Sequence, residues 1–110
     1  MIRPCSSPEQ PGWLDLRLAL WPYHDRRVHL EEMAMFCVAP ERFGQFIAYA
    51  PTNDPQGFVE VALRNDYVNG TRSSPVAFLE GIYVVPEERR SGIARLLIAV
   101  AEDWSRARVH

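Results

Sequence analysis

The strongest constraint in the sequence is an apolar segment that leads through a glycine-containing turn into a long amphipathic helix. Residues 78–86 (FLEGIYVVP) have the composition of a strand that a proline ends. Beyond the polar residues 87–92, apolar side chains recur at helical spacing, namely Ile93, Leu96, Leu97, Val100, Ala101 and Trp104. The pattern predicts a strand, a short loop and the longest helix of the chain.

The loop before this helix is predicted to bind a phosphate group. Backbone N–H groups at the start of a helix are unpaired and carry a partial positive charge. The residues that would surround the anion are Arg89, Arg90, Ser91, Gly92, Ile93 and Ala94. Gly92 would admit the ligand close to the backbone, and the two arginines would add charge-assisted hydrogen bonds. The alternative is an ordinary polar helix start that binds nothing.

Composition and charge exclude several function classes. A chain of 110 residues with 47% hydrophobic content suits a single domain, residues 1–110. Its formal charge of -2 gives no general attraction to nucleic acid, and no apolar run approaches the roughly 20 residues of a membrane-spanning helix. Cys5 and Cys37 lack metal-ligand spacing, and the first 12 residues lack the apolar core of a secretory signal. We therefore expect a cytoplasmic protein without a metal, a nucleic-acid partner or a membrane anchor.

The rest of the chain alternates helical and extended patterns. Residues 1–11 are rich in proline and serine and are expected to form a loosely ordered leader with a short strand near residues 1–3. The remaining predicted elements are helices ending at Trp21-Pro22 and spanning residues 28–39, and strands over residues 45–50, 58–64 and 76–85. Turn residues between the strands favour hairpins. The order predicts an α+β domain with a mostly antiparallel sheet flanked by helices.

Two glutamates on the predicted hairpin are candidate functional groups. Period-two alternation puts Glu60 on one face with Phe58, Ala62 and Arg64, opposite Val59, Val61 and Leu63. The same rule puts Glu80 in an apolar row with Val76, Phe78, Ile82 and Val84. If the hairpin is symmetric about residue 70, the two carboxylates face each other, and their repulsion would raise each pKa. The alternative is that one pairs with Arg64 or caps a helix while the other lies at a wet edge.

The loop and several other segments resemble a known family. Arg89-x-x-Gly92-x-Ala94 after an apolar strand is similar to the acetyl-CoA motif of the GNAT N-acetyltransferases. The resemblance narrows to aminoglycoside 6'-N-acetyltransferases through segments spread over residues 13–106. These segments are LWP at 20–22, GFVEVALR at 57–64, DYVNG at 66–70, SSPV at 73–76 and FLEGIYVVP at 78–86.

The resemblance implies transfer of an acetyl group from acetyl-CoA to the 6'-amino group of an antibiotic sugar, which gives resistance. An acidic cleft with aromatic walls would suit such a polycation, and the residues of these types are Trp21, Glu60, Asp66, Tyr67 and Glu80. Glu80 is the candidate base that takes the proton from the amine. In the family manner, main-chain groups of Ile82, Tyr83 and Val84 would hold the pantetheine arm and stabilise the developing oxyanion.

The chain also departs from the family pattern. In the family, the acetyl-CoA helix is followed by another strand, a helix and further strands, whereas this sequence stops at residues 106–110. The expected domain is therefore C-terminally truncated, with an open sheet edge that invites pairing with a second copy as a homodimer. Two alternatives to the aminoglycoside reaction remain: a catalytically incomplete remnant that binds CoA weakly or only oligomerises, and an acetyltransferase acting on another amine.

Overall fold

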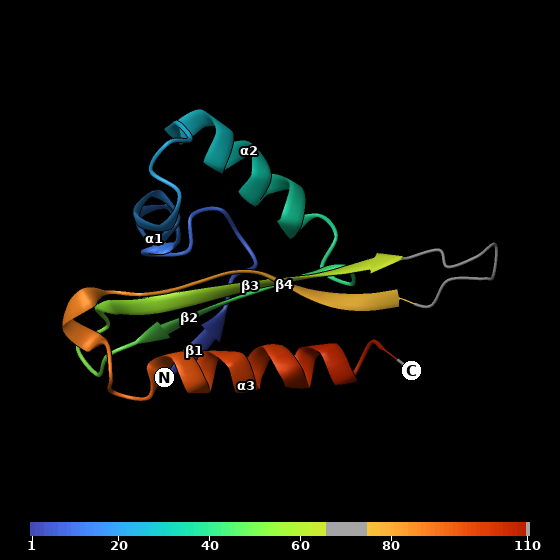
Figure 1. Ribbon diagram of the computed structural model, residues 1–110. Helices are drawn as coiled ribbons and strands as arrows, with labels where there is room; N and C mark the ends of the chain where they lie inside the picture. The colour runs from blue at the N-terminus through green and yellow to red at the C-terminus, as the bar shows by residue number, and fades with distance from the viewer. Residues whose placement is uncertain (66–74, 110) are drawn as a thin grey trace.

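An antiparallel sheet separates two helices on one face from a single helix on the other (Figure 1). The computed structural model describes residues 1–65 and 75–109. Its elements are β1 (Ile2–Pro4), α1 (Trp13–Leu20), α2 (Arg26–Cys37), β2 (Phe43–Tyr49), β3 (Pro55–Asn65), β4 (Pro75–Val84), the 3₁₀ turn η1 (Pro86–Glu88) and α3 (Ile93–Arg106). The predicted α+β class, with an antiparallel sheet between helices, is confirmed.

The helix ends follow from local capping. Helix α1 begins after Gly12, whose φ of 86° suits glycine, and its last turn closes with the Trp21 N–H on the Arg17 carbonyl, just before Pro22. Helix α2 begins two residues earlier than expected because Asp25 caps it and accepts a hydrogen bond from the Val28 N–H at 3.0 Å.

The strands pair in the order β1-β2-β3-β4, and every pairing is antiparallel. The predicted hairpin of β2 and β3 is confirmed and sets Gln45 opposite Glu60. The short strand expected near residues 1–3 is confirmed as β1, which pairs with β2, and Cys5 after it is buried on the α1 side of the sheet. Backbone pairing fixes these residues despite their proline content.

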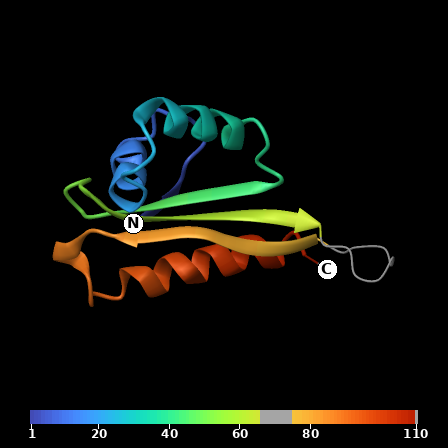
Figure 2. The ribbon, with the colours of Figure 1, turned by 45° about the horizontal axis from the view of Figure 1, so that its top comes forward.

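Helices cover both faces of the sheet (Figure 2), and each face has its own apolar core. Under α3, the buried residues are Ala48, Val59, Val61, Val84, Ile93, Leu97, Ala101 and Trp104. Under α1 and α2, they are Cys5, Trp13, Leu16, Met33, Ile47, Tyr49 and Phe58. The alternation predicted for β3 is confirmed, since its valines pack toward α3 and Phe58 toward α1.

A β-bulge in β4 overturns the predicted register of the two glutamates. Glu60 pairs with Gly81 and Val61 pairs with Leu79, which leaves Glu80 as the extra residue. Glu80 therefore neither faces Glu60 across the strands nor belongs to an apolar row. The inserted residue shifts the side-chain alternation by one, so that Ala77 before the bulge and Ile82 after it both pack toward α3.

Candidate active site

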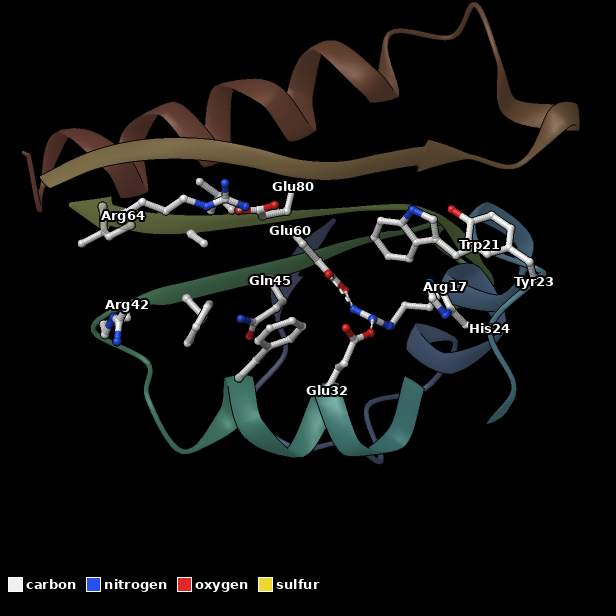
Figure 3. A pocket seen from close by; sticks show the side chains of 15 residues that line it. Arg17, Trp21, Tyr23, His24, Glu32, Arg42, Gln45, Glu60, Arg64 and Glu80 are labelled. Carbon is white, nitrogen blue, oxygen red and sulfur yellow. Dashed lines mark hydrogen bonds and ion pairs between the residues drawn. The ribbon is translucent and has the colours of Figure 1, made fainter. Parts of the chain in front are cut away.

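A cleft of about 380 Å³ opens between the sheet and the two helices on its α1–α2 face (Figure 3). This volume lies within the range of about 300–1,000 Å³ that is typical of small-molecule sites. Its walls come from α1, α2, the loop between them, and strands β2, β3 and β4. The lining residues are Arg17, Trp21, Tyr23, His24, Glu32, Phe36, Arg42, Phe43, Gln45, Glu60, Val61, Ala62, Leu63, Arg64 and Glu80.

Arg17 lies at the centre of a buried polar network at one end of this cleft. Its Nη1 donates to both carboxylate oxygens of Glu60, at 2.6 and 2.5 Å, and its Nη2 donates to Glu32. Its Nε donates to Nδ1 of His29 at 3.1 Å. Since Arg17 can only donate, Nδ1 is the acceptor, and the His29 Nε2–H therefore points to the Trp21 carbonyl oxygen 3.1 Å away.

Glu60 is the buried acceptor of this network and is fixed by hydrogen bonds from Arg17 and Trp13. Only 4% of the residue is exposed, and the Trp13 indole N–H donates to its Oε2 at 2.9 Å. Burial raises the pKa of the Glu60 carboxyl, whereas the guanidinium of Arg17 and the indole N–H oppose that rise. The partner of Glu60 is therefore Arg17, and the glutamate that pairs with Arg64, as one of the two was expected to do, is Glu80.

Glu80, the predicted base, lies on the bulge at the wetter side of the cleft. Its carboxylate accepts from Arg64 at 2.5 Å, and a third of its side chain is exposed. The guanidinium of Arg64 also lies 4.7 Å from the ring centroid of Phe78. Glu80 is thus an accessible carboxylate with an exchangeable counter-ion, in contrast to the sealed Glu60.

Trp21 forms an aromatic wall of the cleft and is fixed from several sides. A Cβ atom built on Gly81 would lie 2.6 Å from the indole ring, so the ring rests directly on the glycine of β4. The guanidinium of Arg17 lies 4.9 Å from the ring centroid, and the edge of Phe58 meets it at a centroid distance of 6.1 Å. The indole can therefore present a rigid apolar surface to a ligand.

The loop predicted to bind phosphate leads into α3 as expected. Gly92 is the residue before the helix, has a φ of 90°, and would leave a Cβ atom with no neighbour within 4 Å. Within the described residues, the backbone N–H groups of Ser91, Gly92, Ile93 and Ala94 have no backbone acceptor. Open space and unpaired donors therefore coincide at the start of α3.

The arginines of this loop are arranged differently from one another. Arg89 donates from Nε to the Val84 carbonyl at 2.9 Å and lies over the Tyr83 ring, while Arg90 is exposed at a φ of 69°. Arg89 therefore ties the loop to the end of β4. Since Gly81 precedes Val84 by three residues, about 10 Å of strand separates the seat of Trp21 from this loop.

The predicted site is only partly brought together in the cleft. Trp21, Glu60 and Glu80 line it, whereas Asp66 and Tyr67 lie outside the described residues. The sequence reasoning missed Arg17, His29, Glu32 and Gln45. Helical spacing contained a signal for two of them. Arg17 follows Trp13 by four residues and His29 precedes Met33 by four, which places each on a buried helix face.

The described part of the chain contains neither a metal-binding cluster nor a membrane-spanning helix. Within residues 1–65 and 75–109, no cluster of three or more histidine, cysteine, aspartate or glutamate side chains is arranged to hold a metal ion. No helix in the same ranges combines the length and the apolar character needed to cross a membrane.

Comparison with known proteins defines the class. The model of the acetyltransferase (GNAT) family matches residues 10–110. The chain belongs to this family. Its relatives within it include the aminoglycoside N(6')-acetyltransferase type 1 of Acinetobacter baumannii, which is 47% identical over 96% of this chain and 70% of its own length. The enzyme of the same name from Serratia marcescens is 44% identical, over 96% of this chain and 72% of its own length.

Solved structures agree with this placement. The aminoglycoside 6'-N-acetyltransferase AAC(6')-Ih from Acinetobacter baumannii superposes with a TM-score of 0.83 at 45% identity, covering 97% of this chain and 71% of its own. AAC(6')-Iy, in complex with the bisubstrate analogue CoA-S-monomethyl-acetylneamine, superposes with a TM-score of 0.82 at 40% identity, covering 94% and 69%. The chain thus spans about 70% of the length of these relatives.

Proposed function

We propose that this protein transfers the acetyl group of acetyl-CoA to the 6'-amino group of aminoglycoside antibiotics and so confers resistance. The observation that carries the proposal is similarity at 47% identity over 96% of the chain to an enzyme named for this reaction. The cleft supports it chemically, because an aminoglycoside is a polycation built of sugar rings. Carboxylates attract its ammonium groups, and an aromatic wall stacks on its rings.

Glu80 is the proposed general base. An ammonium group cannot attack a thioester until it loses a proton, and an accessible carboxylate can accept that proton. In the free protein, Glu80 is paired with Arg64, whose side chain is more than half exposed, so the pair is weak and an incoming ammonium can replace the guanidinium. The neutral amine then forms the new C–N bond, while the C–S bond breaks and the sulfur leaves as the thiol of CoA after taking up a proton.

The start of α3 is the proposed site for acetyl-CoA, which supplies the acetyl group as a thioester when bound. The unpaired N–H groups of Gly92, Ile93 and Ala94 suit a diphosphate, and the absence of a side chain at Gly92 leaves space for it. Arg90 would add charge from the exposed side. Main-chain groups at Ile82, Tyr83 and Val84 would contact the pantetheine arm.

We further propose that the protein acts in the cytoplasm, where acetyl-CoA is available, and that it forms a homodimer. Within the described residues, β4 is one of the two edge strands of the sheet, and unpaired edges favour association with another strand. Analytical ultracentrifugation tests the dimer: sedimentation as a monomer at all concentrations would contradict it.

The function is tested by acetylation of tobramycin with CoA release as the readout, together with calorimetric titration of acetyl-CoA. The unaltered chain should turn over, and Glu80→Gln should lower turnover by about 10²- to 10⁴-fold, because the amide cannot accept the proton. Its affinity for acetyl-CoA should not change. Glu102→Gln, an exposed charge on α3, is the matched control and should keep full turnover. Full turnover in Glu80→Gln would remove Glu80 as the base, and turnover only with other amines would overturn the substrate assignment.

A further inference from the structure

Gln45 on β2 carries a buried amide that no other described residue uses. Only 5% of the residue is exposed, yet its side chain forms no hydrogen bond within residues 1–65 and 75–109. Four charged side chains of the same cleft differ, since Arg17 pairs with Glu60 and Arg64 with Glu80. Buried polar side chains are usually paired, so an orphan amide in this position calls for an explanation.

The amide reaches the open space of the cleft. Within the described residues, no side-chain nitrogen or oxygen is both sealed from solvent and without a partner. Because the amide of Gln45 has no partner among these residues, its polar atoms are not sealed from solvent, and Gln45 lines the cleft. Figure 3 shows the side chain pointing from β2 into the space between the sheet and Glu32 of α2. The amide is therefore available to a ligand that enters the cleft.

An apolar residue would suit the fold better at this position. The residues of β2 that share this face are Phe43, Ile47 and Tyr49, which pack against the α1–α2 side. Burying an unpaired amide among them costs free energy that an aliphatic side chain would not. A polar group kept at such a cost is typical of a binding site rather than of a core.

We propose that Gln45 is a substrate-specificity residue whose amide hydrogen-bonds a hydroxyl or amino group of the aminoglycoside on the floor of the cleft. The inference rests on the proposed function and adds a contact to it. Gln45 and Glu80 lie on strands two positions apart, about 10 Å across the sheet. They would therefore bind different groups of one ligand, with Glu80 at the reacting amine and Gln45 at a group further along the molecule. An amide both donates and accepts, so it suits a hydroxyl group, whereas the carboxylates select for charge.

The test compares Gln45→Met with Gln56→Met. Methionine keeps the length of the side chain and removes its hydrogen-bonding groups. Gln56 is a half-buried glutamine of β3 that does not line the cleft, so it controls for the chemical change. Tobramycin binding is measured by calorimetric titration, and thermal unfolding is measured without ligand. We expect Gln45→Met to bind tobramycin about fivefold more weakly, the equivalent of one net hydrogen bond. Its midpoint of unfolding should equal or exceed that of the unaltered protein, and acetyl-CoA affinity should not change.

Each other outcome has a distinct meaning. Equal tobramycin affinity in Gln45→Met and the unaltered protein would overturn the role of Gln45 and leave the proposed function intact. A clear fall in the unfolding midpoint of Gln45→Met, beyond that of Gln56→Met, would assign the amide to stability and also overturn it. Failure of the unaltered protein to bind tobramycin would instead overturn the proposed function.

Discussion

The two faces of the sheet are covered in similar ways but have different contents. Under α3, the core consists of aliphatic side chains and one indole. Under α1 and α2, the buried layer also holds Arg17, His29 and Glu60, and it opens into the cleft. On each face, the ring of a tryptophan packs directly on a glycine of the sheet: Trp104 on Gly44 and Trp21 on Gly81. The α3 face is therefore built for stability, and the opposite face combines stability with a binding surface.

The largest expected effect comes from breaking the buried ion pair on the cleft side. Arg17→Met should lower the free energy of unfolding by about 3–5 kcal/mol, because it leaves Glu60 buried without its counter-ion. Urea denaturation measures the change. Arg27→Met, which removes an exposed helix pair, should cost less than about 1 kcal/mol. The double variant Arg17→Met, Glu60→Leu should regain much of the loss, and no recovery would show that the network acts through contacts other than the charge pair.

The next largest effect tests whether the core under α3 contributes to stability alone and not to the cleft on the opposite face. Leu97→Ala should destabilise the protein by about 2–5 kcal/mol, since it opens a cavity in the fully apolar core under α3. The neighbouring Leu96→Ala is the matched control, because that leucine is 58% exposed. Below the unfolding transition, neither variant should change the KM for tobramycin. A raised KM in Leu97→Ala would mean that the apolar face also shapes the cleft.

The smallest of these expected effects on stability comes from changing Gly81, the glycine on which the Trp21 ring packs. Gly81→Ala puts a methyl group about 2.6 Å from the indole, so the ring must shift, at a cost of about 1–3 kcal/mol. The KM for tobramycin should rise while the KM for acetyl-CoA stays constant. Gly92→Ala gives the opposite test: it strains the backbone, because the φ of Gly92 is 90°, and its methyl group meets no protein atom but enters the proposed diphosphate site. An unchanged tobramycin KM in Gly81→Ala would remove Trp21 from the substrate wall.

Much of the fold could be predicted because its signals are local. The period of α3, the turn residues between β2 and β3 and the alternation in β3 each depend on neighbouring residues in the sequence. The bulge at Glu80 could not be predicted in this way, because one inserted residue leaves no local signature and changes only the pairing with β3. The error about Glu80 and Glu60 follows entirely from assuming a regular register.

The candidate site was harder to predict than the fold. Trp21, Glu80 and the loop at Gly92 were predicted through resemblance and helix-start chemistry, and Trp21 and Glu80 line the cleft. Arg17 and Gln45 were missed because a single polar residue in an apolar pattern is normally assigned to the solvent side. Their roles depend on partners from other elements: Glu60 and His29 in the case of Arg17, and an open cavity in the case of Gln45.

The placement of the three indoles has a practical consequence. Trp13 is buried in the core with its N–H on Glu60, Trp104 packs from α3 against the sheet, and of the three indoles Trp21 alone lines the cleft. The fluorescence of Trp21 can therefore report binding of the antibiotic in the cleft. A change in emission on adding tobramycin, lost in Trp21→Phe, would register binding in an unlabelled protein, while the other two indoles keep a constant background until the chain unfolds.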